Sequence, residues 1–98
     1  MLSEGSADLS RHRRILDRIR AIPEGFVRTY GDIDRGAPRL VGRVLATTNE
    51  NVPWHRVVRS DGTVPKGVAQ LRLLRAEGVP IRGHRVDLAQ ARLPDLQA

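Results

Sequence analysis

The residues best suited to chemistry stand together in the segment Pro53-Trp54-His55-Arg56-Val57-Val58, near the middle of the 98-residue chain. His55 could act as a base, and in a nucleophilic mechanism it would activate a neighbouring thiol. The chain has no cysteine, however, so thiol nucleophiles, thiolate metal sites and disulfide bonds are excluded. Beside His55 stands the only tryptophan, Trp54. An indole is no nucleophile, but it offers a broad apolar wall to a ligand, unless Trp54 is a plain core residue.

Two other chemistries have less support. The three histidines, His12, His55 and His84, are scattered along the chain without the paired spacing of metal ligands. Lys66 is the only lysine, and a Schiff base on it would imply glycosylase or lyase activity. A single exposed lysine more often contacts a phosphate than forms a Schiff base. Because the histidines also lack the spacing of metal ligands, we expect neither a metal nor a cofactor.

The charge of the chain favours a polyanionic partner. It holds 17 Lys and Arg against 11 Asp and Glu, a formal net charge of +6, and all but one of the basic residues is arginine. A guanidinium combines permanent charge with a planar fork of donors, which suits phosphates and base edges. A biased genomic base composition and an ordinary solvated face are the alternatives for this excess of arginine.

Four segments carry helix signals. Apolar residues at helical spacing predict a helix over 9–22, and Thr29 with Asp32 has the form of a capping box that starts a short helix. Pro38 suits the first turn of a further helix over 38–47. The last helix is predicted over 68–77, where Gly78 is placed to end it in a left-handed conformation.

The remaining signals indicate a small β-hairpin. Val57-Val58-Arg59 and Thr63-Val64 are predicted to be strands, with a tight turn between them, and a last strand is predicted near Val86 and Leu88. The two short helices after residue 29 form a helix-turn-helix pattern, to which this hairpin would add a wing. We therefore expect a mostly α, winged helix-turn-helix fold with three to four helices.

The length predicts one domain over residues 9–88, with flexible tails over 1–8 and 89–98. No stretch approaches the roughly 20 apolar residues of a membrane span, and no signal peptide is evident. A cytoplasmic protein is expected, associated with the nucleoid in a bacterium.

Several motifs together resemble one family, the DNA-binding domain of the O6-alkylguanine-DNA alkyltransferases, over about residues 10–88. In the family's order, the matching motifs are Tyr30-Gly31-Asp32-Ile33, Pro38-Arg39-Leu40-Val41-Gly42, Pro53-Trp54-His55-Arg56-Val57-Val58, Asp61-Gly62 and Glu77-Gly78-Val79. In the enzymes the third motif reads Pro-Cys-His-Arg, and its cysteine accepts the alkyl group. Tryptophan at that position is the mark of the alkyltransferase-like proteins, which this chain therefore resembles.

The resemblance implies a lesion pocket without a nucleophile. Trp54 would line the pocket that receives a flipped base, Pro53 would shape its mouth, and Val57 and Val58 would lie near its lid. His55, Arg56 and Glu77 match the framework that serves the cysteine in the enzymes. With no sulfur to activate, these three residues would have a structural role and the protein would not be an enzyme.

The resemblance also assigns DNA contacts to Tyr30, Arg39 and Gly42 and places Lys66 near the pocket lid, whereas DNA contacts of Arg43 and Lys66 are expected from their position and charge. Arg39 matches the family's arginine finger, which enters the minor groove and fills the gap left by the flipped base; a phosphate-contacting arginine is the alternative. Tyr30 matches the tyrosine that pushes on the phosphate 3′ to the target, unless it is a half-buried core tyrosine. Gly42 would allow close backbone approach, unless it only serves packing, and Arg43 and Lys66 would contact phosphates.

The chain departs from the family pattern in three places. The spacing from Tyr30 to Arg39 is short, so the first helix of the helix-turn-helix is expected to be truncated or replaced by a turn. The segment 47–51 is compressed relative to the family's hinge, so that either Asn49 or Asn51 could serve as the hinge asparagine. The family's wing tyrosine has no counterpart near residues 64–67.

The function implied is non-enzymatic recognition of O6-alkylguanine in duplex DNA by nucleotide flipping. The expected partners are duplex DNA with that lesion and, by the resemblance, the proteins of nucleotide excision repair, and the protein would be a monomer. The alternative is a winged-helix transcription regulator that reads undamaged DNA sequence in the major groove.

Overall fold

The longest helix, α1 (Glu4–Arg20), packs one apolar stripe into the core. The computed structural model describes residues 4–94, and the ends of the two predicted tails, 1–3 and 95–98, lie outside the described residues. Ile15, Leu16 and Ile19 are buried, whereas Leu9, predicted to belong to this stripe, is 69% exposed. The helix begins five residues before the predicted start, because polar residues can extend an exposed helix without any apolar signal.

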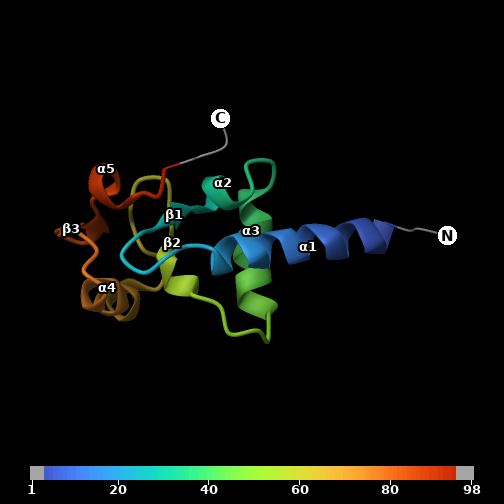
Figure 1. The fold of residues 1–98 in the computed structure, drawn as a ribbon, viewed down its shortest axis with the longest axis horizontal. Coiled ribbons are helices and arrows are strands. Elements are labelled where there is room, and N and C mark those ends of the chain that lie inside the picture. The colour runs from blue at the N-terminus through green and yellow to red at the C-terminus, as the bar shows by residue number, and fades with distance from the viewer. Residues whose placement is uncertain (1–3, 95–98) are drawn as a thin grey trace.

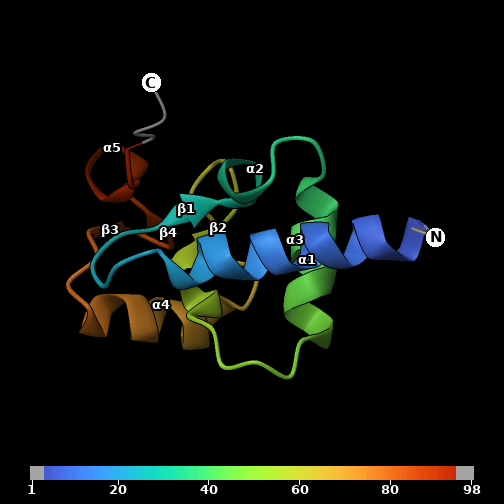
Figure 2. The same ribbon diagram turned by 45° about the vertical axis from the view of Figure 1, so that its right-hand side comes forward.

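The two helices that follow begin where the sequence predicts. The Thr29 side chain accepts a hydrogen bond from the Asp32 amide, and the Asp32 carboxylate accepts one from the Thr29 amide, so the predicted capping box starts α2 (Tyr30–Ile33). At four residues this helix is as short as the spacing implied. Helix α3 (Pro38–Thr47) has the predicted bounds and buries Val41 and Val44. It runs across α1 (Figures 1 and 2), against which it packs.

The prediction that residues 57–59 and 63–64 pair as the two strands of a hairpin is wrong. β2 (Val57–Val58) instead pairs in parallel with β1 (Arg28–Thr29). Only the turn remains at residues 59–63, with the Arg59 amide donating to the Thr63 carbonyl at 3.0 Å. β2 has buried side chains on both of its faces, so it lies in the interior. The chain beyond it turns towards the C-terminal part of the molecule, where Thr63 forms a β-bridge with Arg85.

The antiparallel hairpin of the fold lies later in the chain. It consists of β3 (Ile81–Arg82) and β4 (Arg85–Val86). Before it, α4 (Gly67–Ala76) occupies the predicted helix within one residue, and Gly78 has the expected left-handed conformation, with φ of 81°.

Residues 89–94 are not a loose tail. Leu88, predicted to lie in a strand, begins a last helix, α5 (Leu88–Ala91). The Val27 amide donates to the Ala91 carbonyl at 2.9 Å, and the Leu93 amide donates to the Val27 carbonyl at 2.8 Å. Ala91 is buried, so these bonds and this contact hold the segment against the start of β1.

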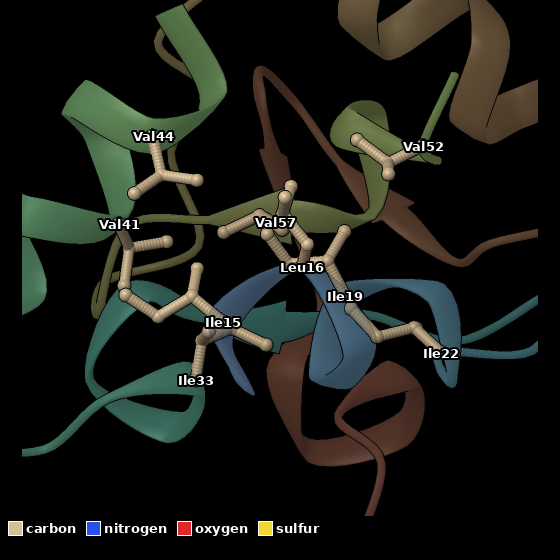
Figure 3. Packing of buried hydrophobic residues seen from close by; sticks show 9 residues of the cluster. All are labelled: Ile15, Leu16, Ile19, Ile22, Ile33, Val41, Val44, Val52 and Val57. Carbon is tan, nitrogen blue, oxygen red and sulfur yellow. The ribbon is translucent and has the colours of Figure 1, made fainter. Parts of the chain in front are cut away.

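The core consists of two clusters that meet at β2. One cluster lies between α1, α2 and α3, and Val57 stands among its nine buried residues (Figure 3). The other lies between α4, the β3–β4 hairpin and α5, and contains Val58. In Figures 1 and 2 the paired strands β1 and β2 accordingly lie between helices α2 and α3 on one side and helices α4 and α5 on the other.

The mostly helical class with a small β component is confirmed. Residues 4–94 contain five α-helices, against the three to four predicted, and one short 3-10 helix, η1 (Trp54–Arg56). None of these helices combines the length and the apolar character needed to cross a membrane.

Candidate nucleic-acid interface

Helix α3 presents two arginines on its outer face. Arg39 and Arg43 stand one turn apart and are exposed, while Val41 and Val44 hold the opposite face in the core. Neither guanidinium has a carboxylate partner among the described side chains, residues 9–94. Both charges are therefore available to an anionic ligand.

Tyr30 and Gly42 lie next to each other where α2 meets α3. Tyr30 is half-buried against the first core cluster, and this burial raises the pKa of its hydroxyl, although the positive charge of Arg59 works against the rise. A Cβ atom added at Gly42 would stand 4.0 Å from Tyr30 Cε1, which is an ordinary contact. Packing against Tyr30 thus does not demand a glycine, and the residue instead leaves bare backbone beside the tyrosine.

Trp54 lies on η1 and is not a core residue. Its side chain is 37% exposed and makes an edge-to-face contact with the His55 ring, with the ring centroids 5.9 Å apart. An open hollow of about 440 Å³ adjoins it, formed by residues 51–56 together with Arg20 of α1. Trp54 and Pro53 thus line a common hollow, as the predicted pocket requires.

Val57 and Val58 do not line this hollow. Both side chains are completely buried, each in a different core cluster. Successive residues of a strand point to opposite sides, which places one valine in each cluster. Their predicted position near the pocket lid is therefore corrected to the core.

His55, Arg56 and Glu77 form one hydrogen-bonded network behind Trp54. His55 Nε2 lies 2.8 Å from Glu77 Oε2, and Arg56 donates to both carboxylate oxygens, from Nε at 2.9 Å and from Nη2 at 2.7 Å. Arg56 Nη1 also donates to the Ile22 carbonyl at 2.8 Å. The hydrogen bonds from Arg56 hold the pKa of Glu77 at about 2, against the opposing effect of burial, with a further contribution from His55. The network ties η1 to the end of α4 and to the segment after α1.

Gln70, which no motif in the sequence singles out, belongs to the same framework. This buried side chain donates to the His55 carbonyl at 3.0 Å and to the Val57 carbonyl at 2.8 Å, and it accepts a hydrogen bond from the Lys66 amide. The sequence held one signal for this role: the spacing of Gln70 from Leu71 and Leu74 places it on the buried face of the helix. Lys66 itself is exposed and stands at the start of α4.

Replacing Gln70 by leucine is expected to destabilise the protein by about 1–3 kcal/mol, because the carbonyls of His55 and Val57 would lose their donor. Denaturant unfolding followed by circular dichroism would measure the change. Gln90→Leu, at an exposed position, is the matched control. Equal stability of the two variants would contradict the role given to Gln70.

The structure brings the predicted residues together in groups. Tyr30 adjoins Gly42, Arg39 and Arg43 share one face of α3, and Pro53 and Trp54 share the hollow. No residue of α3 lines that hollow. The arginine face and the indole are thus separate features of one small domain.

Two features together define the class of this protein. One is an exposed arginine face on a short helix-turn-helix, and the other is a partly exposed indole beside a His–Glu–Arg network. They indicate a DNA-binding domain of the alkyltransferase type in which the thiol is replaced. Comparison with known families agrees with this class. Residues 10–79 match the family described as 6-O-methylguanine DNA methyltransferase, DNA binding domain. The chain belongs to this family, as one of its alkyltransferase-like members.

Individual relatives support the same placement. The DNA base-flipping protein of Escherichia coli K12 is 41% identical over 92 residues, which cover 82% of this chain and 71% of that protein. Alkyltransferase-like protein 1 of Schizosaccharomyces pombe is 40% identical over 62 residues, which cover 56% of this chain and 57% of that protein. The crystal structure of S. pombe Atl1 in complex with damaged DNA containing O6-carboxymethylguanine superposes with a TM-score of 0.77 at 27% identity, covering 97% of this chain and all of that one.

Proposed function

We propose that this protein is a non-enzymatic sensor of DNA damage that binds O6-alkylguanine in duplex DNA by flipping the damaged nucleotide. The observation that carries the proposal is the partly exposed Trp54, which lines a hollow at the position where the family's enzymes have their acceptor cysteine. The similarity to a DNA base-flipping protein and to a protein crystallised with alkylated DNA supports the same function.

Alkyl transfer is not part of the proposed function, because the chain contains no cysteine to receive the group. In direct dealkylation a thiolate attacks the alkyl carbon, and a histidine draws off the thiol proton. Here the His55 ring lies between the Trp54 indole and the Glu77 carboxylate. The residues that would activate a thiol therefore hold the backbone of η1 in place.

Flipping a guanine costs a few kcal/mol in lost stacking and pairing, and less when an alkyl group has already weakened the base pair. Arg39, which has no carboxylate partner among the side chains of residues 9–94, would fill the vacated space in the duplex from the outer face of α3. Tyr30, half-buried beside Gly42, would press on the neighbouring phosphate. Trp54 and Pro53 would receive the everted base, and Arg43 and Lys66 would contact phosphates.

Arg39→Ala is expected to weaken binding to an O6-methylguanine duplex by about 1–3 kcal/mol, the range for a specific base contact. The matched control is Arg43→Ala, one turn further along the same exposed face, which should weaken binding to damaged and undamaged duplexes alike. Fluorescence anisotropy with labelled duplexes at several salt concentrations would measure both. A uniform loss in the Arg39 variant would reduce this residue to a phosphate contact.

The alternative function is transcriptional regulation through sequence readout in the major groove, which the exposed arginines of α3 would also serve. Two duplexes that differ only in one O6-methyl group distinguish the two functions, at a stated salt concentration. A lesion sensor binds the methylated duplex more tightly and changes its Trp54 fluorescence on binding. A sequence reader does not distinguish the two duplexes, and that result would end the proposal.

The downstream partner we propose is the machinery of nucleotide excision repair, on the basis of the family resemblance, and we propose that the sensor acts as a monomer. Because the lesion is left unrepaired, a further step must remove it. Co-sedimentation of the protein, a lesion duplex and purified excision-repair recognition proteins tests the partner, and analytical ultracentrifugation of the free protein tests the monomer.

A further inference from the structure

Two adjoining hollows lie along α2, apart from Trp54. Their volumes are about 490 and 480 Å³, and they share Arg28, Asp32, Arg35 and Leu93. Arg18 of α1 lines the first hollow, and Arg92 lines the second. We call these six residues and the hollows between them the arginine trough.

The arginine trough has an excess of positive charge. Four of its residues are arginines and one is an acid, Asp32. Asp32 accepts two hydrogen bonds from Arg92, at 2.9 and 2.6 Å, so these two charges compensate each other. Arg18, Arg28 and Arg35 remain without a carboxylate partner among the side chains that the structure describes, those of residues 9–94. An anionic ligand in the trough would therefore meet three uncompensated guanidinium groups.

Two of these guanidinium groups are held in place by neutral groups. Arg18 Nη1 donates to the Ile33 carbonyl at 2.7 Å, and Arg28 Nη2 donates to the Pro94 carbonyl at 3.4 Å. A carbonyl orients the side chain without cancelling its charge, and a guanidinium has five N–H donors, so donors remain for a ligand. Such preorganisation lowers the entropy lost on binding.

The arginine trough and the outer face of α3 lie on different sides of α2. Tyr30 packs towards Gly42, and Ile33 enters the core, whereas Gly31 and Asp32 line the trough. Binding of DNA along α3 would therefore leave this surface to a second ligand.

The lining of the trough indicates what that ligand is. Besides the arginines it contains Leu93, shared by both hollows, and Leu88 and Pro94 in the second. Carboxylates match the donor fork of arginine, and an apolar side chain would cover the leucines. A duplex is a convex rod whose projecting groups are charged phosphates, so it suits a partly apolar hollow less well. We propose that the arginine trough binds an acidic segment of a partner protein in which apolar side chains alternate with carboxylates.

The test uses two short fluorescein-labelled peptides of equal charge, one alternating Glu and Leu and the other alternating Glu and Ser. Arg28→Glu/Arg35→Glu reverses the net charge of the trough, because two arginines then face three carboxylates, and Arg72→Glu/Arg75→Glu, at exposed positions on α4, makes the same change in net charge elsewhere. We expect the Glu-Leu peptide to bind about tenfold more weakly to the trough variant, a difference of about 1.4 kcal/mol, and equally well to the α4 variant and the unmodified protein. The Glu-Ser peptide should bind more weakly than the Glu-Leu peptide throughout.

Two results would overturn the proposal. Equal losses in the trough and α4 variants would mean that the peptide senses only net charge. If neither peptide binds and the trough variant loses affinity for undamaged duplex, the trough is a surface that binds DNA. Arg35→Glu alone, in the exposed turn before α3, keeps the test valid should the double variant unfold. The ratio of affinities for damaged and undamaged duplex is measured in the same variants, so that failure of this proposal and failure of lesion recognition are distinguished.

Discussion

Trp54→Ala should abolish most of the preference for an O6-alkylguanine duplex over an undamaged one. Contact between an aromatic side chain and a base contributes about 1–3 kcal/mol, so the ratio of the two affinities should fall by about fivefold to 150-fold. Binding to the undamaged duplex should change little, because the arginines of α3 stay in place. The side chain is 37% exposed, so its removal does not open a closed cavity in the core.

Anisotropy titrations with labelled duplexes would measure the two affinities of the Trp54→Ala protein. Phe26→Ala is the matched control, since Phe26 is also an aromatic side chain with 37% exposure and stands outside the hollow. Its variant should retain the lesion preference. If the Trp54 variant still distinguishes the lesion as well as the control does, the indole does not grip the everted base.

Glu77→Gln should destabilise the protein by about 3 kcal/mol near neutral pH, because it removes the negative charge that Arg56 and His55 share. Folding holds the pKa of this carboxyl at about 2, below its usual value of 4.5. A lowered pKa means that the folded state prefers the ionised form. The stabilisation is therefore complete above about pH 4.5 and is lost as the pH falls towards about 2.

The measurement is urea unfolding of both proteins at a series of pH values. The difference in unfolding free energy between wild type and Glu77→Gln should be constant near neutral pH and should shrink on acidification below about pH 4.5. Asp17→Asn, at a position whose side chain is 60% exposed, should change the stability by less than about 0.5 kcal/mol. A difference that does not vary with pH would show that the charge of Glu77 does not stabilise the fold.

Local signals in the sequence were enough to predict several elements closely. The bounds of α3 were predicted from Pro38 and from the apolar stripe of Val41 and Val44. The start of α2 was predicted from the capping box of Thr29 and Asp32. Each of these signals acts within one or two turns of chain. The pattern of motifs around Trp54 likewise identified the family.

The errors concern contacts between distant segments. Val57 and Val58 pair with Arg28 and Thr29, nearly thirty positions earlier, and nothing in their local pattern distinguishes a buried parallel strand from the edge of a hairpin. Two adjacent valines are equally compatible with a pocket lid. Likewise, Gln70 shows its role only when the carbonyls of η1 are placed opposite it.

The direct continuation of η1 into β2 limits how this site can change. Val57 enters one cluster and Val58 the other, so an insertion or deletion of one residue after Trp54 would exchange their sides and disrupt both halves of the core. A substitution at position 54 disturbs neither. Mutation can therefore exchange the side chain at position 54, which under the proposed function would receive the base, but the core fixes the chain length between that side chain and the two valines.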